Sequence, residues 1–180
     1  MLLFRKSSFA KVKNKSAYVL RAEKIKELGR NESLNTESLL ELQPDVIVAF
    51  TMDGSNKSLS TVQKSGIPVV FNSDWTENTP LGKAEWIKFF GAFYGKMDAA
   101  ISFFDEVEKE YLKAQELAET AETKPTVVAG AMYKDQWYLP AGDSWQAVFM
   151  EDANSEYLFA DSEGTGSLSL SFEAVFAQAA

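Results

Sequence analysis

Two glutamates occupy the same place in a short pattern that occurs twice in the chain. Ser33–Leu40 near the front and Ser169–Phe176 at the end each combine small polar residues, a Glu and an apolar stretch. A small polar residue followed by Glu predicts the first turn of a helix in each copy. Glu37 and Glu173 are then held at matching places on two similar units. There the carboxylates complement the dipole of the helix.

The residue types that carry much of enzyme chemistry are missing from this chain of 180 residues. It contains no Cys and no His, which excludes Cys/His zinc sites, cysteine nucleophiles and Ser-His-Asp triads. The net charge of −8 argues against binding to a nucleic-acid backbone and, more weakly, against adsorption to anionic lipid. A hydrophobic share of 46% indicates a folded core. No apolar stretch reaches the roughly 20 residues of a membrane-spanning helix, and Met1–Lys6 is too short for a signal peptide.

The elements that must position the first glutamate form a strand–helix–strand pattern. Asn35 predicts a helix cap and Pro44 predicts the end of that helix. Val46–Phe50 is apolar throughout, which is typical of a parallel strand covered on both faces. A short helix over 57–65 and a second apolar run at Val69–Phe71 then complete a βαβ unit.

Two helices are predicted to follow this unit. Thr79-Pro80 is a good helix start, and Leu81–Tyr94 is apolar nearly all round, so this helix should be sandwiched between other elements. Apolar residues at helical spacing over about Met97–Ala121, with charges opposite, predict a longer helix. A long helix with one solvent-exposed face, placed between two α/β segments, is expected to connect them rigidly.

The remaining sequence predicts a second α/β unit. Thr126–Met132 is expected to be its first strand and Gln136–Leu139 another, while Asp143 or Ser144 can cap a helix that holds Trp145. The predicted organisation is therefore an N-terminal lobe over residues 1–79, connecting helices over 80–121 and a C-terminal lobe over 122–180.

This order of elements resembles the substrate-binding proteins of ABC importers, in the group for iron complexes, haem and vitamin B12. The residues that carry the resemblance are Leu34–Val48 and Ser65–Val70, and the segments 80–89 and 130–138 look like the branch found in Bacteroides-type bacteria. The resemblance implies an α/β fold of the class III type, in which two lobes with parallel sheets are joined by a long backbone helix. Proteins of this group usually begin with another strand–helix–strand unit and continue with further elements after the position of Glu173. This sequence has no counterpart of either. The chain is therefore expected to be truncated at both ends, with both lobes incomplete.

The resemblance also implies a function. It is that of an extracytoplasmic receptor that captures a ferric siderophore, haem or cobalamin and delivers it to an ABC permease dimer. Such a protein has no enzymatic activity and no cofactor of its own. The full-length protein would be periplasmic or a membrane-anchored lipoprotein, with the lipid on the missing N-terminus. The alternatives are a docking protein that has lost its ligand and a chelate-processing enzyme.

Site residues follow from the same resemblance. Glu37 and Glu173 would pair with Arg side chains of the permease. The ligand cleft is expected between the lobes, at the carboxyl ends of strands. Its candidate residues have large apolar or aromatic side chains, which suit a flat ligand, although such residues are also frequent in cores: Phe50, Met52, Trp75, Met132, Tyr133, Trp137 and Trp145. Because the chain lacks His, Tyr133 is the candidate for binding haem iron directly.

Overall fold

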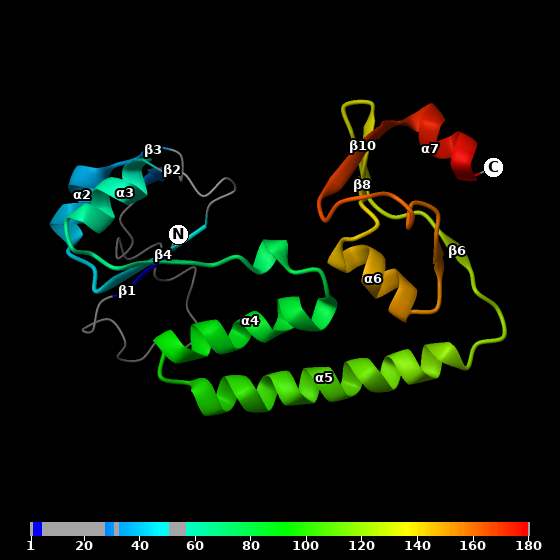
Figure 1. Cartoon of the computed structure of the whole chain (residues 1–180), viewed down its shortest axis with the longest axis horizontal. Coiled ribbons are helices and arrows are strands. Elements are labelled where there is room, and N and C mark those ends of the chain that lie inside the picture. Colours follow the sequence, from blue (N-terminus) through cyan, green and yellow to red (C-terminus); the bar gives the residue numbers. More distant parts are fainter. Residues whose placement is uncertain (1, 5–27, 31–32, 51–56, 180) are drawn as a thin grey trace, which may run out of the picture. The chain divides into compact units, whose positions relative to one another are not determined.

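The computed structural model describes residues 2–4, 28–30, 33–50 and 57–179, and they form two compact units, residues 1–73 and 74–180. The first unit contains a three-stranded sheet in the order β1–β4–β5 (Figure 1). β4 (Val46–Ala49) and β5 (Val69–Phe71) are parallel and joined by helix α3 (Lys57–Lys64), which confirms the predicted βαβ unit. β1 (Leu2–Phe4) pairs antiparallel with β4. This strand was not predicted, because three apolar residues are too few to show a period.

Helix α2 (Thr36–Leu42) begins and ends as its sequence indicates. The Asn35 side chain accepts a hydrogen bond from the backbone N–H of Ser38 at 2.9 Å, and Gln43 adopts a left-handed conformation just before Pro44. A short hairpin, β2 (Gly29–Arg30) and β3 (Ser33–Leu34), precedes the helix. The core of this unit consists mainly of aliphatic side chains from α2, α3 and β4: Leu28, Leu34, Leu39, Ile47, Ala49, Leu59 and Val62.

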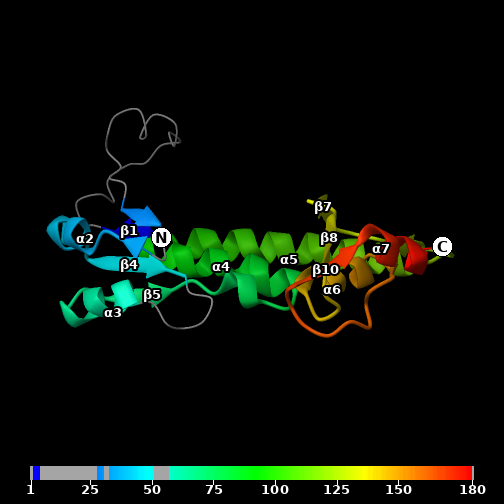
Figure 2. The same cartoon turned by 90° about the horizontal axis from the view of Figure 1, so that it is seen from above.

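The second unit starts with a pair of antiparallel helices. A short 3₁₀ turn, η2 (Asp74–Thr76), leads into α4 (Pro80–Phe93), and α5 (Met97–Glu119) runs back alongside it (Figures 1 and 2). The two helices approach closely at Gly91, where an added Cβ would lie 2.6 Å from the Cβ of Ala100.

The prediction that α4 is sandwiched is confirmed in part: the helix packs against α5 and α6 and most of its side chains are half-buried, but Gly91 is its one fully buried residue among those described. Its aromatic side chains instead lie in a row and contact one another, with Phe89 at ring-centroid distances of 5.0–5.2 Å from Trp86, Phe90 and Phe93.

The rest of the second unit holds two small sheets. β6 (Thr126–Val127) and β9 (Glu156–Tyr157) are parallel. β7 (Ala131–Tyr133), β8 (Gln136–Pro140) and β10 (Ser167–Ser171) form an antiparallel sheet in the order β10–β8–β7. The sequence pattern predicted one strand over 126–132, and the structure divides it at Gly130, whose φ of +101° only glycine adopts readily. The α/β class is confirmed, but the larger sheet of this unit is antiparallel.

Two helices complete the second unit. The Ser144 hydroxyl caps α6 (Trp145–Asp152) by accepting a hydrogen bond from the N–H of Ala147. Ser171 caps α7 (Phe172–Ala179) in the same way, through the N–H of Ala174 at 3.2 Å. The core between helices and strands consists of Leu139, Ala147, Tyr157, Phe159 and Val175.

Candidate ligand-binding site

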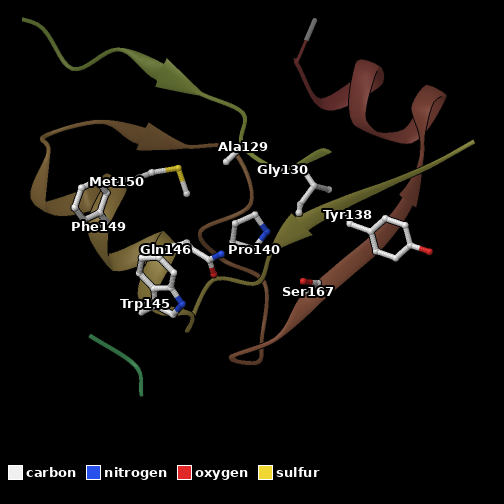
Figure 3. A pocket seen from close by; sticks show the side chains of 10 residues that line it. Ala129, Gly130, Tyr138, Pro140, Trp145, Gln146, Phe149, Met150 and Ser167 are labelled. Atoms are coloured by element: carbon white, nitrogen blue, oxygen red, sulfur yellow. The ribbon is translucent and has the colours of Figure 1, made fainter. Parts of the chain in front are cut away.

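A pocket of about 470 Å³ lies in the second unit, between α6, the end of β8 and the segment that links β6 to β7 (Figure 3). Helix α6 contributes one wall from its first two turns, and Ser167 closes the side at the start of β10. The lining residues are Ala129, Gly130, Tyr138, Leu139, Pro140, Trp145, Gln146, Phe149, Met150 and Ser167.

The lining is aromatic and aliphatic, with neutral polar groups. Trp145 and Phe149 present aromatic rings, and Met150 adds a flexible thioether. The polar groups are the Tyr138 phenol, the Gln146 amide and the Ser167 hydroxyl. None of the ten lining side chains carries a charge. A surface of this kind binds the face of a flat apolar molecule and hydrogen-bonds its edge.

The alternation of β8 separates its two aromatic residues. Successive side chains of a strand point to opposite faces, so Trp137 shares the face of Leu139, which is in the core, while Tyr138 lies on the other face; Tyr138, Leu139 and Pro140 all line the pocket at the end of the strand. The register pairs Ala131 with Tyr138 and Met132 with Trp137. Tyr133 therefore shares the sheet face of Tyr138, and Met132 shares that of Trp137.

Hydrogen bonds to α5 hold the far end of α6. The Asp152 carboxylate accepts bonds from the Tyr111 hydroxyl at 2.5 Å and from Nε2 of Gln115 at 2.7 Å. Burial, reinforced by the hydrogen bond and negative charge of Asp152, raises the pKa of Tyr111 well above its ordinary value. The Tyr111 ring also lies 6.0 Å from that of Phe149, a lining residue. The long helix thus fixes the wall that carries the pocket aromatics.

The near end of α6 is held by α4 and the turn before it. Nζ of Lys83 lies 5.4 Å from the centroid of the Trp145 ring, and the same ammonium donates to the backbone carbonyl of Asp74 at 3.1 Å. Its distance to the Asp74 carboxylate is 3.9 Å. Trp86 braces the same turn, because its Nε1 donates to the Glu77 carboxylate at 2.9 Å.

The predicted ligand residues fall into different places. Trp145 lines the pocket, whereas Met132 and Tyr133 lie at the exposed end of the β7–β8 hairpin, outside the lining. Trp137 is half-buried, with its Nε1 donating to the carbonyl of Ala129 at 3.1 Å and its ring stacked on Phe172.

Two further predicted residues, Trp75 and Phe50, are not among the lining residues either. Trp75 is exposed on η2 of the second unit, and Phe50 is exposed at the end of β4 in the first unit. Met52 lies outside the described residues.

Of the ten lining residues only Trp145 was predicted; the other nine include the large side chains of Tyr138, Phe149 and Met150. Alternation along β8 would have found Tyr138, since a strand that turns Trp137 to the core turns Tyr138 away from it. The spacing of Trp145 and Phe149, four residues apart on one helix, would have placed their side chains together.

The repeated glutamate pattern is also a structural repeat. Glu37 is the second residue of α2 and Glu173 is the second residue of α7, and both helices follow a short strand and a capping side chain. Two residues further on, Leu39 and Val175 are buried in their respective cores. Both glutamate side chains are exposed. The pattern thus presents one carboxylate to solvent on each unit.

Comparison with known proteins assigns this architecture to a family. The model of the periplasmic binding protein family matches residues 5–180. An uncharacterized lipoprotein of Methanocaldococcus jannaschii is 34% identical over 153 residues, which cover 83% of this chain. The periplasmic vitamin B12 binding protein of Vibrio cholerae superposes with a TM-score of 0.64 at 16% identity, over 91% of this chain. A periplasmic heme binding protein of Pseudomonas aeruginosa superposes with a TM-score of 0.63 at 18% identity, also over 91%.

The matched proteins are longer than this chain. The chain spans 36% of the length of the lipoprotein, 62% of the vitamin B12 binding protein and 58% of the heme binding protein. The two structural likenesses establish the class III fold of periplasmic binding proteins. Within the ranges that the structure describes, every helix is too short or too polar to cross a bilayer.

Proposed function

Because the chain belongs to the periplasmic binding protein family, we propose that it is the substrate-binding component of an ABC importer. It captures its ligand outside the cytoplasm and delivers it to the permease dimer. The lipoprotein relative supports an extracytoplasmic location with a lipid anchor. The proposal concerns the whole protein, since this chain spans part of its relatives.

The observation that carries the proposal is the aromatic, uncharged pocket of the second unit. Trp145 and Phe149 from α6 line one side, and Tyr138 from β8 contributes to the lining at the opposite side, with its ring apart from the other two (Figure 3). Aromatic faces suit part of the face of a flat ligand such as a corrinoid, haem or aryl siderophore. Such a ligand brings its own metal ion, so the protein needs no resident cofactor. For haem, the exposed Tyr133 on the pocket face of the sheet is the proposed iron ligand.

Delivery is assigned to the two glutamates. Glu37 and Glu173 are exposed at equivalent helix starts, one on each unit. We propose that each pairs with an Arg of the permease. One exposed ion pair contributes only about 0–1 kcal/mol, so both pairs and the surrounding contacts are needed. Charges of this kind mainly orient the partners and speed their encounter.

A thermal-shift titration tests ligand binding. The probes are cyanocobalamin, cobinamide, hemin and several ferric siderophores, added to the wild-type chain and to two variants. A ligand that binds the native state raises the melting temperature with its concentration. We expect one ligand class to give a saturable rise with wild type and with Phe103→Ala, whose ring is exposed on α5. The Trp145→Ala variant should show no ligand-dependent rise in melting temperature.

The outcomes separate the alternatives. A cooperative melt with no shift for any probe would overturn the proposed receptor function and favour a docking protein that has lost its ligand. Conversion of a chelate during incubation, followed by its absorption spectrum, would favour an enzyme. Glu37→Lys and Glu173→Lys should keep the thermal shift but lose delivery to permease-containing vesicles. Unchanged delivery would refute the docking role.

A further inference from the structure

We propose that this pocket selects a flat metal complex of zero or positive net charge with neutral hydrogen-bonding groups at its edge, and discriminates against the same ring bearing carboxylates. The inference rests on the proposed receptor function and narrows its ligand class. It comes from the charges around the pocket, which the aromatic lining does not by itself determine.

Among the described residues that line the pocket, none offers a positive charge to an anion. Its polar groups are the neutral side chains of Tyr138, Gln146 and Ser167, which can donate to or accept from amides and hydroxyls. A carboxylate that enters this pocket loses water without gaining a cation. The effective cost of burying an unpaired ion completely is several kcal/mol, and in this open pocket, where Tyr138 and Phe149 are 43% and 50% exposed, a carboxylate bears only part of that cost. The desolvation cost of an amide is much smaller, because these side chains can replace the hydrogen bonds that the amide made with water.

The cation that the structure places against the lining is already engaged. Lys83 lies over the Trp145 ring, but its ammonium donates to the Asp74 carbonyl and lies 3.9 Å from the Asp74 carboxylate. The positive charge therefore has a negative partner within the same cluster. A second anion would have to compete with Asp74 for it.

The N-terminus of α6 is the feature that could favour an anion. The effect of a helix dipole on a charge is about 0.3–1 kcal/mol at an exposed site. Here the Ser144 hydroxyl already accepts the N–H of Ala147. Asp143 places a carboxylate at the same end of the helix, where it also accepts a bond from the N–H of Gly164 at 2.7 Å. The Asp143 carboxylate therefore already interacts with the positive end of the helix dipole. The attraction that remains for a ligand carboxylate is too small to offset its desolvation.

The second unit as a whole repels anions. Residues 74–180 contain 19 Asp and Glu but 7 Lys and no Arg. A surface with this imbalance lowers the local concentration of anionic ligands and raises that of cations, and the effect weakens as salt is added. The field outside the pocket thus favours the same ligands as the lining inside it.

The test uses two corrins that share one ring and one cobalt. Cobinamide carries neutral amide side chains, whereas cobyrinic acid carries carboxylates in their place. Isothermal titration of the wild-type chain should give an affinity for cobinamide at least tenfold higher than for cobyrinic acid at low salt. Added salt should reduce the difference between the two affinities. Gln146→Lys, which places a cation on an exposed lining position, should raise the ratio of the affinity for cobyrinic acid to the affinity for cobinamide at least fivefold.

The outcomes distinguish this inference from the function on which it rests. Equal affinity for the two corrins, or tighter binding of cobyrinic acid, would overturn the charge preference while leaving receptor function in place. The same holds if hemin, with its two propionates, binds more tightly than cobinamide. If the corrins, hemin and the ferric siderophores all fail to bind, the proposed function fails and the charge preference falls with it. Gln146→Glu is the matched control, since its added negative charge should lower the affinity for cobyrinic acid below that of the wild-type chain.

Discussion

Tyr111→Phe isolates the hydrogen bond that holds α6 to the long helix. The substitution removes one oxygen and keeps the ring, which contacts Phe149 at a centroid distance of 6.0 Å. The lost bond joins the Tyr111 hydroxyl to the Asp152 carboxylate at 2.5 Å. Hydrogen bonds to charged groups contribute about 1.5–3 kcal/mol. Because the site is only partly buried, the lower end of this range applies.

The expected decrease in the free energy of unfolding is therefore about 1.5 kcal/mol. For a chain of this size that corresponds to a fall in melting temperature of roughly 3–6 °C. Urea denaturation measures the change, with Tyr133→Phe as the control because Tyr133 is 61% exposed on the hairpin. Asp152→Ala should cost more, since it also removes the bond from Gln115.

A double-mutant cycle then tests whether the two groups act together. Tyr111→Phe in the Asp152→Ala background should cost at least 1 kcal/mol less than in wild type, because its partner is already gone. A cost for Tyr111→Phe within about 0.3 kcal/mol of zero, or strict additivity in the cycle, would refute the argument that this bond fastens the pocket wall.

Three further predictions concern stability and backbone geometry. Gly130→Ala should destabilise the chain by more than about 3 kcal/mol, since its φ is +101° and an added Cβ would lie 2.0 Å from the Tyr138 carbonyl oxygen; Gly166→Ala, with open space around it, should be close to neutral in the same urea titration. Burial raises the pKa of Tyr157 to about 12 from an unfolded value near 10, so the stability it contributes is complete below pH 10 and lost as pH rises through 12. Tyr157→Phe should remove that alkaline loss, and an unchanged pH profile would contradict the assignment. Leu39→Ala should cost roughly 2–5 kcal/mol, because the side chain is completely buried in the first unit, and a cost below 1 kcal/mol would count against that core.

Local sequence signals predicted the elements well where a cap or a long period was present. Asn35, Thr79 and Ser144 cap the helices that their types indicate, and the long helix ends within two residues of its predicted limit. These features depend on neighbouring residues, which is why the sequence alone reveals them. The equivalence of Glu37 and Glu173 was predicted for the same reason.

The pocket was harder to predict because it depends on pairing between distant strands. Trp145 was named as a large aromatic near the expected cleft and lines the pocket, whereas Tyr138 lies on the face of β8 opposite to Trp137, which the sequence pattern did not reveal. Trp137 was expected at the ligand, but the same alternation turns it to the core. Gly130 divides a strand that the apolar pattern predicted as continuous, since a single φ angle interrupts the ladder without changing hydrophobicity.

The most direct test of the central claim is an isothermal titration of cobinamide into wild type, Trp145→Ala and Phe103→Ala, with far-ultraviolet circular dichroism confirming that all three are folded. Binding through the pocket predicts a saturable heat for wild type and Phe103→Ala and a loss of at least tenfold in affinity for Trp145→Ala. Equal affinity in all three chains would contradict the assignment of the ligand to this pocket.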